Sequence, residues 1–216
     1  MDHLLTKAIS NNAVPSFIEI LIWPGATLYG WQGMLYFWPA IMYYYNGFTK
    51  GMIPFLLSAA IGQSINRFGK QLFQRDRPVP PSPLPKRHFY VKVPSKKGSG
   101  DGPSFPSGDS MAAGVVGTSL YFFTNNPYYL LLIAWGMVGR VYYHCHYFFD
   151  TLVGASVGLS STWLTFYIQS LRDRDTEEDE DEGFSMLEFG FFAICFVVWM
   201  KASKIVAKTL RNAIGL

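Results

Sequence analysis

The sequence predicts an all-α protein, a single membrane domain folded as a bundle of about six transmembrane helices. Half of the 216 residues are hydrophobic and 17% are aromatic, while only 15% are charged, well below the roughly 25% of ordinary soluble domains. The charges are also clustered, so long stretches of the chain are nearly free of them. Because several of these stretches are long enough to cross a bilayer, we expect a polytopic membrane protein.

The N-terminal quarter of the chain predicts two of these spans. Residues 1–15 form a short polar lead-in, which could be a helix lying at the membrane interface. Residues 17–45 are apolar and aromatic with Pro and Gly among them, and we expect one crossing there. Residues 52–65 form the second crossing, joined to the first by a tight connection at residues 46–50.

The longest polar connection is the stretch of residues 78–105. It is basic and rich in Pro and Gly, a composition that favours an extended, mobile loop. It is either a plain linker or a segment whose basic side chains attract anionic lipid head groups.

Three further crossings follow this loop, over residues 107–123, 128–143 and 151–171. The first of them carries small residues at close spacing, including Gly114 and Gly117. Small side chains let helix backbones approach closely in a membrane, so we expect this span to pack tightly against its neighbours.

The C-terminal part of the chain begins with an acidic run. Residues 172–183 are expected to be disordered and solvated, and residues 173–182 within them could dock a protein partner. Residues 184–200 form a sixth, shorter span. The tail, residues 201–216, mixes basic and apolar residues as an interfacial helix would.

The strongest functional pattern lies between Gly139 and Asp150, where Arg140, His146 and Asp150 stand six and four residues apart. If this stretch is helical, His146 and Asp150 lie one turn apart on the same face. A carboxylate beside an imidazole fixes the tautomer of the ring and stabilises its cation. An arginine nearby offers a planar fork for an oxyanion such as phosphate.

Two upstream segments fit the same chemistry. Lys70 and Arg77 stand in K-Q-L-F-Q-R-D-R-P, and Ser107, Gly108 and Asp109 follow Pro106 at the start of an apolar run. The start of a helix offers free N–H groups that can cradle a phosphate, although Ser107 could also be a simple N-cap. The six-span layout places all three segments on one side of the membrane, which indicates one shared site.

Together, K-x6-R-P, P-S-G-x and R-x5-H-x3-D resemble the three-part signature of the type 2 phosphatidic acid phosphatase family, which is related to the vanadium haloperoxidases. The resemblance covers about residues 50–170 and implies a helical membrane phosphatase. It implies that His146 is a nucleophile that forms a phosphohistidine and that Asp150 holds its ring. It also implies that Lys70, Arg77 and Arg140 neutralise the phosphoryl oxygens.

This chain departs from the family pattern at Asp109, where the family has a histidine that protonates the leaving group, and more mildly at Gly139, where the family has Ser. Asp109 could be the general acid, but nearby cations and the helix start favour its charged form. Three different consequences follow from this departure. The activity has an acidic pH optimum, or the leaving group needs little protonation, or His144 or His88 replaces the family's histidine as proton donor. The second would favour lipid diphosphates.

We expect no cofactor and no metal. His144, Cys145 and His146 alternate, so on a helix they would diverge, whereas a zinc site needs three or four convergent ligands. The resemblance also implies independence of divalent ions. The haloperoxidase branch consists of soluble enzymes, and this chain is too apolar to belong there. The two cysteines, Cys145 and Cys195, predict no disulfide framework.

The sequence thus predicts a metal-independent lipid phosphate phosphatase acting on phosphatidic acid, a sphingoid phosphate or a polyprenyl diphosphate. The alternatives are a catalytically weakened lipid-binding or scaffold protein and a transferase of the same family. The expected partners are the lipid substrate and the bilayer, with no nucleic acid. We expect an integral, multi-pass location in an endomembrane such as the endoplasmic reticulum.

The side of the membrane that the site faces stays open. Three of the 18 Lys and Arg residues, Lys50, Arg172 and Arg174, fall on the far side of the predicted layout. The positive-inside rule therefore favours a cytoplasmic site. The family resemblance implies the opposite, because many members act on the lumenal or outer face.

Overall fold

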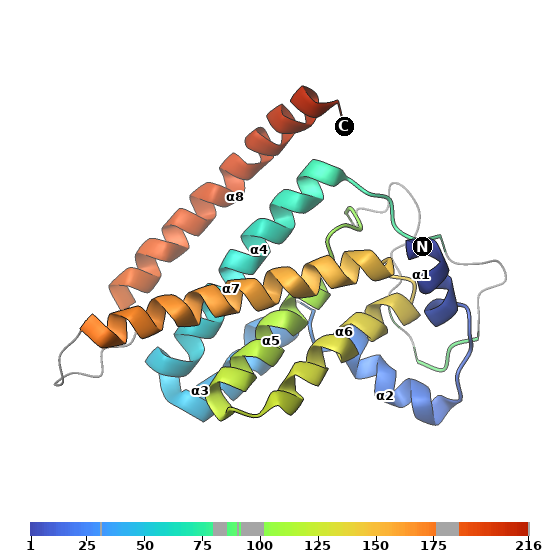
Figure 1. Cartoon of the computed structure of the whole chain (residues 1–216), viewed down its shortest axis with the longest axis horizontal. Helices are drawn as coiled ribbons and strands as arrows, with labels where there is room; N and C mark the ends of the chain where they lie inside the picture. Colours follow the sequence, from blue (N-terminus) through green and yellow to red (C-terminus); the bar gives the residue numbers. More distant parts are fainter. Residues whose placement is uncertain (31, 80–85, 90, 92–101, 176–185, 216) are drawn as a thin grey trace.

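The computed structural model describes residues 1–30, 32–79, 86–89, 91, 102–175 and 186–215. These residues are helical and contain no strand, which confirms the all-α prediction (Figure 1). In chain order the elements are α1 (Asp2–Ser10), α2 (Ser16–Thr27), the π-helical η1 (Gly33–Phe37), α3 (Trp38–Gly47), the π-helical η2 (Phe48–Met52), α4 (Ile53–Phe73), α5 (Gly108–Thr124), the 3-10 helix η3 (Pro127–Leu130), α6 (Leu131–Tyr142), α7 (Phe148–Asp175) and α8 (Met186–Ile214).

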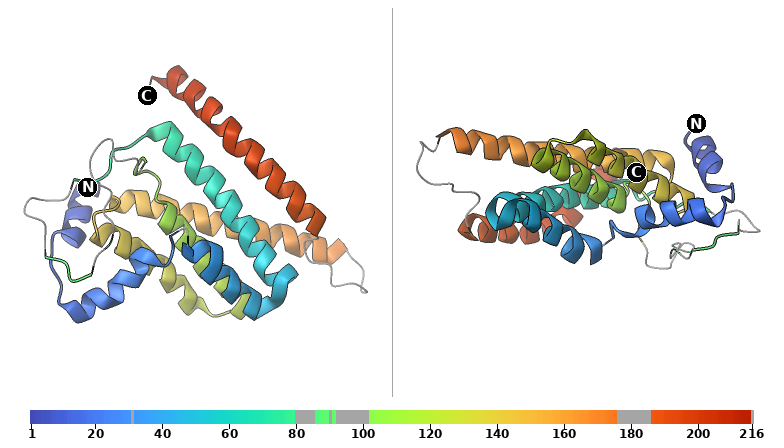
Figure 2. Two further views of the ribbon diagram at one scale, coloured as in Figure 1. Left: turned by 180° about the vertical axis from the view of Figure 1, so that it is seen from behind. Right: turned by 90° about the horizontal axis from the view of Figure 1, so that it is seen from below.

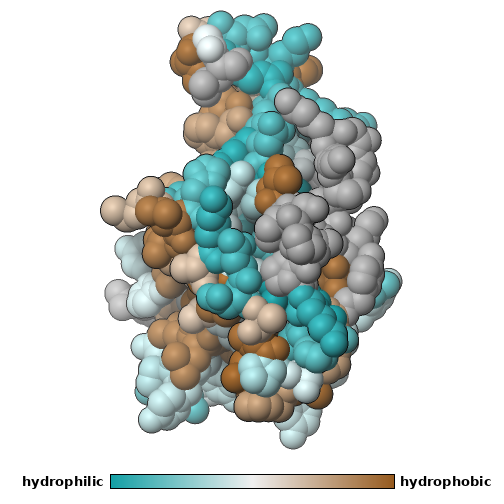
Figure 3. All heavy atoms as spheres, turned by 90° about the vertical axis from the view of Figure 1, so that its right-hand side faces the viewer, coloured by the Kyte–Doolittle hydropathy of each residue, from teal (hydrophilic) through white to brown (hydrophobic). Residues whose placement is uncertain are grey.

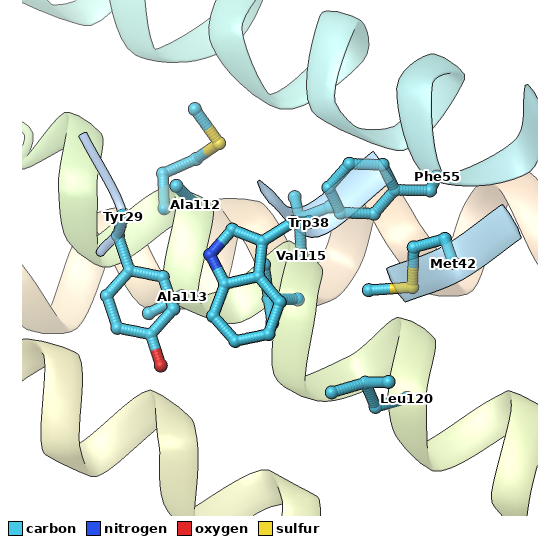
Figure 4. Packing of buried hydrophobic residues seen from close by; sticks show 10 residues of the cluster. Tyr29, Trp38, Met42, Phe55, Ala112, Ala113, Val115 and Leu120 are labelled. Carbon is cyan, nitrogen blue, oxygen red and sulfur yellow. The ribbon is translucent and has the colours of Figure 1, made fainter. Parts of the chain in front are cut away.

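Helix α5 lies at the centre of the fold and packs against α4, α6 and α7. Every residue from Ser110 to Leu120 is buried, as expected for a helix that is apolar on all sides. Tyr29, Trp38 and Phe55 pack against α5 to form the main core (Figure 4). In the right-hand view of Figure 2, α7 and α6 lie on one side of the molecule and α3 and α8 on the other.

Glycines let α5 and α7 approach closely. A Cβ atom at Gly158 of α7 would lie 2.0 Å from the carbonyl oxygen of Met111, and one at Gly114 of α5 would lie 2.5 Å from the carbonyl oxygen of Ala155. Any larger side chain would push these helices apart. The predicted tight packing of the span that starts at Ser107 is therefore confirmed.

The predicted single crossing over residues 17–45 is wrong, because the structure divides it between α2 and α3 with η1 at their junction. Gly33 explains the break. A Cβ atom there would lie 1.8 Å from the carbonyl oxygen of Leu28, so only glycine fits at the point where η1 begins. Pro24, inside α2, also lacks the N–H that an unbroken ladder of helix hydrogen bonds requires.

The lead-in is a helix, as the sequence allows, whereas the predicted acidic loop begins later than expected. The lead-in forms α1, which packs against α6 and α7 as part of the body of the molecule. Helix α7 continues to Asp175, so residues 172–175 of the predicted acidic loop are helical. Arg172 favours this extension, because a cation stabilises the negative end of a helix dipole. Residues 176–185, and with them most of the proposed docking run 173–182, lie outside the described residues.

The C-terminal residues form one helix. Helix α8 runs without interruption from Met186 to Ile214 and packs along α4, so the predicted short span and interfacial tail are a single element. Within the ranges that the structure describes, no helix has both the length and the hydropathy needed to cross a bilayer.

Part of the predicted loop at residues 78–105 is anchored to the body. The buried carboxylate of Glu19 on α2 accepts hydrogen bonds from the N–H groups of His88 and Phe89, at 2.9 and 3.2 Å. The Arg87 guanidinium donates to the carbonyl oxygens of Asn12 and Tyr142, each at 3.1 Å. Residues 80–85, 90 and 92–101 of this loop lie outside the described part of the chain.

Candidate active site

The three sequence segments meet at one end of the helical body. Lys70 lies in the last turn of α4, Ser107 caps α5, and His146 lies in the turn between α6 and α7. Arg77 comes within 3.3 Å of His146, and the N–H of Ser107 donates to the carbonyl oxygen of Asp150 at 3.0 Å. Figure 3 views the molecule from its α1 side, where hydrophilic side chains gather in a band.

The segment from Gly139 to Asp150 is not a single helix, so that premise of the sequence analysis is wrong. Helix α6 ends at Tyr142, and His144 takes a left-handed backbone conformation with φ of 55° before α7 begins at Phe148. The turn nevertheless keeps His146 close to Asp150, with 3.9 Å between Nδ1 and Oδ2.

The His146 ring is buried and held from both nitrogens. Its Nδ1 lies 2.7 Å from the carbonyl oxygen of Ser104, which can only accept, so we assign the ring proton to Nδ1. The Nε2 atom then carries the lone pair and faces Nη1 of Arg77 at 3.3 Å. The ring thus presents an unprotonated nitrogen to a cation that can hold an anionic ligand.

Asp150 reaches the ring through Ser104 rather than directly. At 3.9 Å its Oδ2 is beyond hydrogen-bond distance from Nδ1, but it accepts a short hydrogen bond from the Ser104 hydroxyl, which itself lies 3.4 Å from Nδ1. The same Oδ2 accepts the N–H of Tyr147 at 3.1 Å, and Oδ1 pairs with Nη1 of Arg75 at 2.7 Å. Asp150 is therefore fully buried but completely partnered.

Neither Ser104 nor Arg75 is among the site residues that the sequence predicts. The available signal for Ser104 was its place two residues before Pro106-Ser107-Gly108. Because only two residues separate Ser104 from Ser107 at the start of α5, the Ser104 side chain lies at the same site.

Burial lowers the pKa of His146 to about 4. The nearby cations Arg140, Arg77 and Lys70 also lower it, whereas Asp150 raises it. Burial alone would raise the pKa of Asp150, but contacts with His146, Ser104 and Arg75 hold it below its usual value. At neutral pH the site therefore combines a neutral imidazole with an ionised carboxylate.

Lys70 and Arg77 both hold the chain just before α5. The Lys70 ammonium donates to the carbonyl oxygen of Pro103 at 2.7 Å, and Nε of Arg77 donates to that of Gly102 at 3.2 Å. Arg77 also donates to the carbonyl oxygen of Cys145 at 2.8 Å. Burial, followed by the charge of Arg77, lowers the pKa of Lys70 to about 8.

Ser107 caps the N-terminus of α5. Its hydroxyl accepts the N–H of Ser110 at 3.3 Å. The N–H groups of Gly108 and Asp109, in the first turn, have no partner within a helix by the geometry of an α-helix. The start of α5 thus presents donors and a partial positive charge beside Asp150 and His146.

Asp109 forms an ion pair with Arg140, with 2.9 Å between Oδ2 and Nη2. Nη1 of Arg140 donates to the carbonyl oxygen of Ala26 at 2.9 Å. The Asp109 side chain is 25% exposed and that of Arg140 only 12%. The residue that departs from the family pattern is thus the counter-ion of one of the three expected phosphate-binding cations.

The candidate site combines cationic side chains with a buried imidazole. Three cations, a helix start and one unprotonated imidazole nitrogen converge on it, and a carboxylate stabilises the imidazole from behind. Among the described residues, no group of three or more His, Cys, Asp or Glu side chains could hold a metal ion.

Comparison with known proteins found one matching family and a similar fold. The family model for the PAP2 superfamily matches residues 51–174. The fold is similar to the crystal structure of LpxE from Aquifex aeolicus, with a TM-score of 0.58 and 20% sequence identity over 76% of this chain and 93% of that one. No match was found among curated proteins.

Proposed function

Since this chain belongs to the PAP2 superfamily, we propose that it is a phosphatase that hydrolyses the phosphomonoester or diphosphate of a membrane lipid through a phosphohistidine. The observation that carries the proposal is the arrangement around His146. Its Nδ1 is held by a carbonyl oxygen, and its Nε2 faces the guanidinium of Arg77.

In the first step, Nε2 of His146 attacks phosphorus, and the bond between phosphorus and the leaving oxygen breaks. The ring becomes a phosphorylated imidazolium, whose charge is stabilised by Asp150 through the Ser104 hydroxyl. In the second step, water attacks phosphorus, the P–N bond breaks, and inorganic phosphate leaves with the ring returned to its neutral form.

Lys70, Arg77 and the start of α5 hold the phosphoryl oxygens while charge redistributes. Arg140 joins them once phosphate competes with Asp109 for its guanidinium. Because these cations can neutralise the phosphoryl group themselves, the proposed reaction needs no metal ion.

Asp109 is the candidate proton donor to the leaving oxygen, but its carboxylate is engaged in an ion pair with the guanidinium of Arg140. A leaving group that departs without a proton suits such a site. A lipid monophosphate leaving from a diphosphate is more acidic than an alcohol, so we rank polyprenyl diphosphate slightly ahead of phosphatidic acid and sphingoid phosphates.

We further propose that the protein resides in a bilayer, in an endomembrane such as the endoplasmic reticulum. The support is the set of large hydrophobic side chains that are exposed on most of the helices, which a water-facing surface disfavours. Examples are Leu21, Tyr44, Leu131, Trp163 and Ile194.

The test is phosphate release by detergent-purified protein, comparing wild type with His146→Ala on phosphatidic acid, sphingosine phosphate and a polyprenyl diphosphate. Chelator is present throughout. We expect release by the wild type and none by the variant. Equal release by both proteins would refute the role of His146, and release only after magnesium is added would refute metal independence.

A second candidate function is binding of a lipid phosphate without turnover. The ion pair between Asp109 and Arg140 favours it, because a carboxylate occupies the place of the family's proton donor. Absence of release on every substrate, together with tight binding of phosphatidic acid in vesicles, would favour this alternative.

A further inference from the structure

Helix α1 contacts the candidate active site through its first turn. Asp2 is the central residue: its Oδ2 pairs with Nη2 of Arg75 at 2.7 Å, and its Oδ1 accepts the N–H of Phe149 at 2.9 Å. One carboxylate thus ties together the segment after α4 and the first turn of α7.

Arg75 continues this connection to Asp150. Its Nη1 lies 2.7 Å from Oδ1 of Asp150, while its guanidinium lies over the ring of Tyr147 at 4.0 Å from the centroid. The order of contacts is therefore Asp2, Arg75, Asp150, then the Ser104 hydroxyl and the His146 ring.

Two more side chains of α1 hold the same region of α7. The Thr6 hydroxyl accepts the N–H of Phe148 at 3.0 Å, and the ring of His3 meets that of Tyr147 edge to face at 4.8 Å. Two N–H groups at the start of α7, which have no partner within that helix, are thus satisfied by α1. Helix α1 lies before the residues that match the family model, 51–174.

We propose that α1 is a built-in part of the active site and that Asp2 is a positioning residue, which acts through Arg75 to orient the carboxylate of Asp150. The proposal rests on the proposed function. With Oδ1 held by Arg75, Oδ2 of Asp150 is directed at Ser104 and the N–H of Tyr147. Without Asp2, Arg75 loses one of its two carboxylate partners, and Asp150 is free to turn with it.

This role differs from mere anchoring of the N-terminus. Charge-assisted hydrogen bonds hold both ends of the Arg75 guanidinium, so its position depends on Asp2 and Asp150 together. An anchoring role would change stability alone. A positioning role changes kcat, because Asp150 matters most when the imidazolium forms.

The experiment compares phosphate release from phosphatidic acid in detergent micelles by wild type, Asp2→Ala, Arg75→Gln and the double variant. The matched control is Lys7→Gln, an exposed residue of the same helix. We expect Asp2→Ala to lower kcat by about ten- to a hundredfold with KM nearly unchanged, as loss of one charged hydrogen bond predicts. Lys7→Gln should match wild type.

The double variant separates positioning from anchoring. If Asp2 acts through Arg75, the double variant is no slower than Arg75→Gln alone, because the pathway is already broken. If the two losses in kcat multiply, the residues act independently and the proposal is wrong. It is also wrong if Asp2→Ala keeps wild-type kcat.

Failure of the proposed function is recognised by a wild type that releases phosphate from none of the three lipids, and hydrogen exchange then tests α1 without turnover. The peptide amides of residues 147–152 should exchange faster in Asp2→Ala than in wild type or Lys7→Gln. Unchanged exchange in Asp2→Ala would overturn the role of Asp2 whatever the protein does to lipids.

Discussion

The Ser104 hydroxyl links Asp150 to the His146 ring, and its removal is the sharpest test of how the site works. Ser104→Ala deletes the hydroxyl that donates to Oδ2 of Asp150 and lies 3.4 Å from Nδ1 of His146. The backbone carbonyl of Ser104 stays in place, so the tautomer of the ring is preserved. The variant therefore removes the hydrogen-bonded path from the Asp150 carboxylate to the His146 ring and leaves the proton on Nδ1 of His146 in place.

The expected cost follows from one hydrogen bond to a charged group, about 1.5 to 3 kcal/mol. If this free energy is added to the barrier of the step that forms the imidazolium, kcat falls by about 10- to 100-fold. Lys70 and Arg77, the proposed phosphate-binding residues, are untouched, so KM should change little.

The assay is steady-state phosphate release from phosphatidic acid, with Ser119→Ala as the matched control. Ser119 is equally buried, and its hydroxyl has no hydrogen-bond partner, so removing it should leave kcat unchanged. Wild-type kcat in Ser104→Ala would refute the reasoning, because Asp150 would then need no bridge to the ring.

Three further perturbations test other parts of the account. Because the pKa of Lys70 is lowered to about 8, its charge should be lost as the pH rises through that value. Lys70→Arg should extend activity to higher pH, since a guanidinium stays charged. If kcat/KM falls at the same alkaline pH in this variant as in wild type, loss of the Lys70 charge is not the cause of that fall. Asp109→His should raise phosphate release at neutral pH if protonation of the leaving group limits the rate; no gain counts against that limit. Gly158→Ala places a methyl group 2.0 Å from the carbonyl oxygen of Met111 and should lower the free energy of unfolding by about 1 to 3 kcal/mol. A denaturation curve like that of wild type would contradict the close packing of α5 on α7.

The sequence was sufficient to predict the all-α class and the grouping of three segments at one site. Each segment carries its chemistry within a few residues, as with Ser107 at the start of α5 and His146 four residues before Asp150. Short spacings of this kind survive changes in backbone detail. His146 stays near Asp150 although a turn at His144 replaces the expected helix.

The partners of Asp150 could not be predicted in the same way. Arg75 lies 75 residues before it, and Ser104 lies 46 residues before it. No local pattern reports such contacts, because they depend on how α4, α5 and α7 pack. Asp2 lies even farther from Asp150 in the sequence, and no pattern distinguishes it from the other polar residues of the lead-in.

The break within residues 17–45 illustrates a different difficulty. Hydropathy alone describes this stretch as one apolar segment, whereas Gly33 and Pro24 decide how the backbone runs. The effect of Gly33 depends on the close approach of the Leu28 backbone, which only the folded chain reveals.

The measurement that most directly tests the central claim is chemical trapping of the intermediate. Wild-type protein is mixed with phosphatidic acid or a polyprenyl diphosphate, quenched within one turnover under alkaline conditions, digested and examined by mass spectrometry. The account predicts a phosphoryl group on His146, which is absent in His146→Ala and accumulates when the hydrolysis step is slowed. Phosphate release without phosphorylation of His146 at any time point would contradict the account.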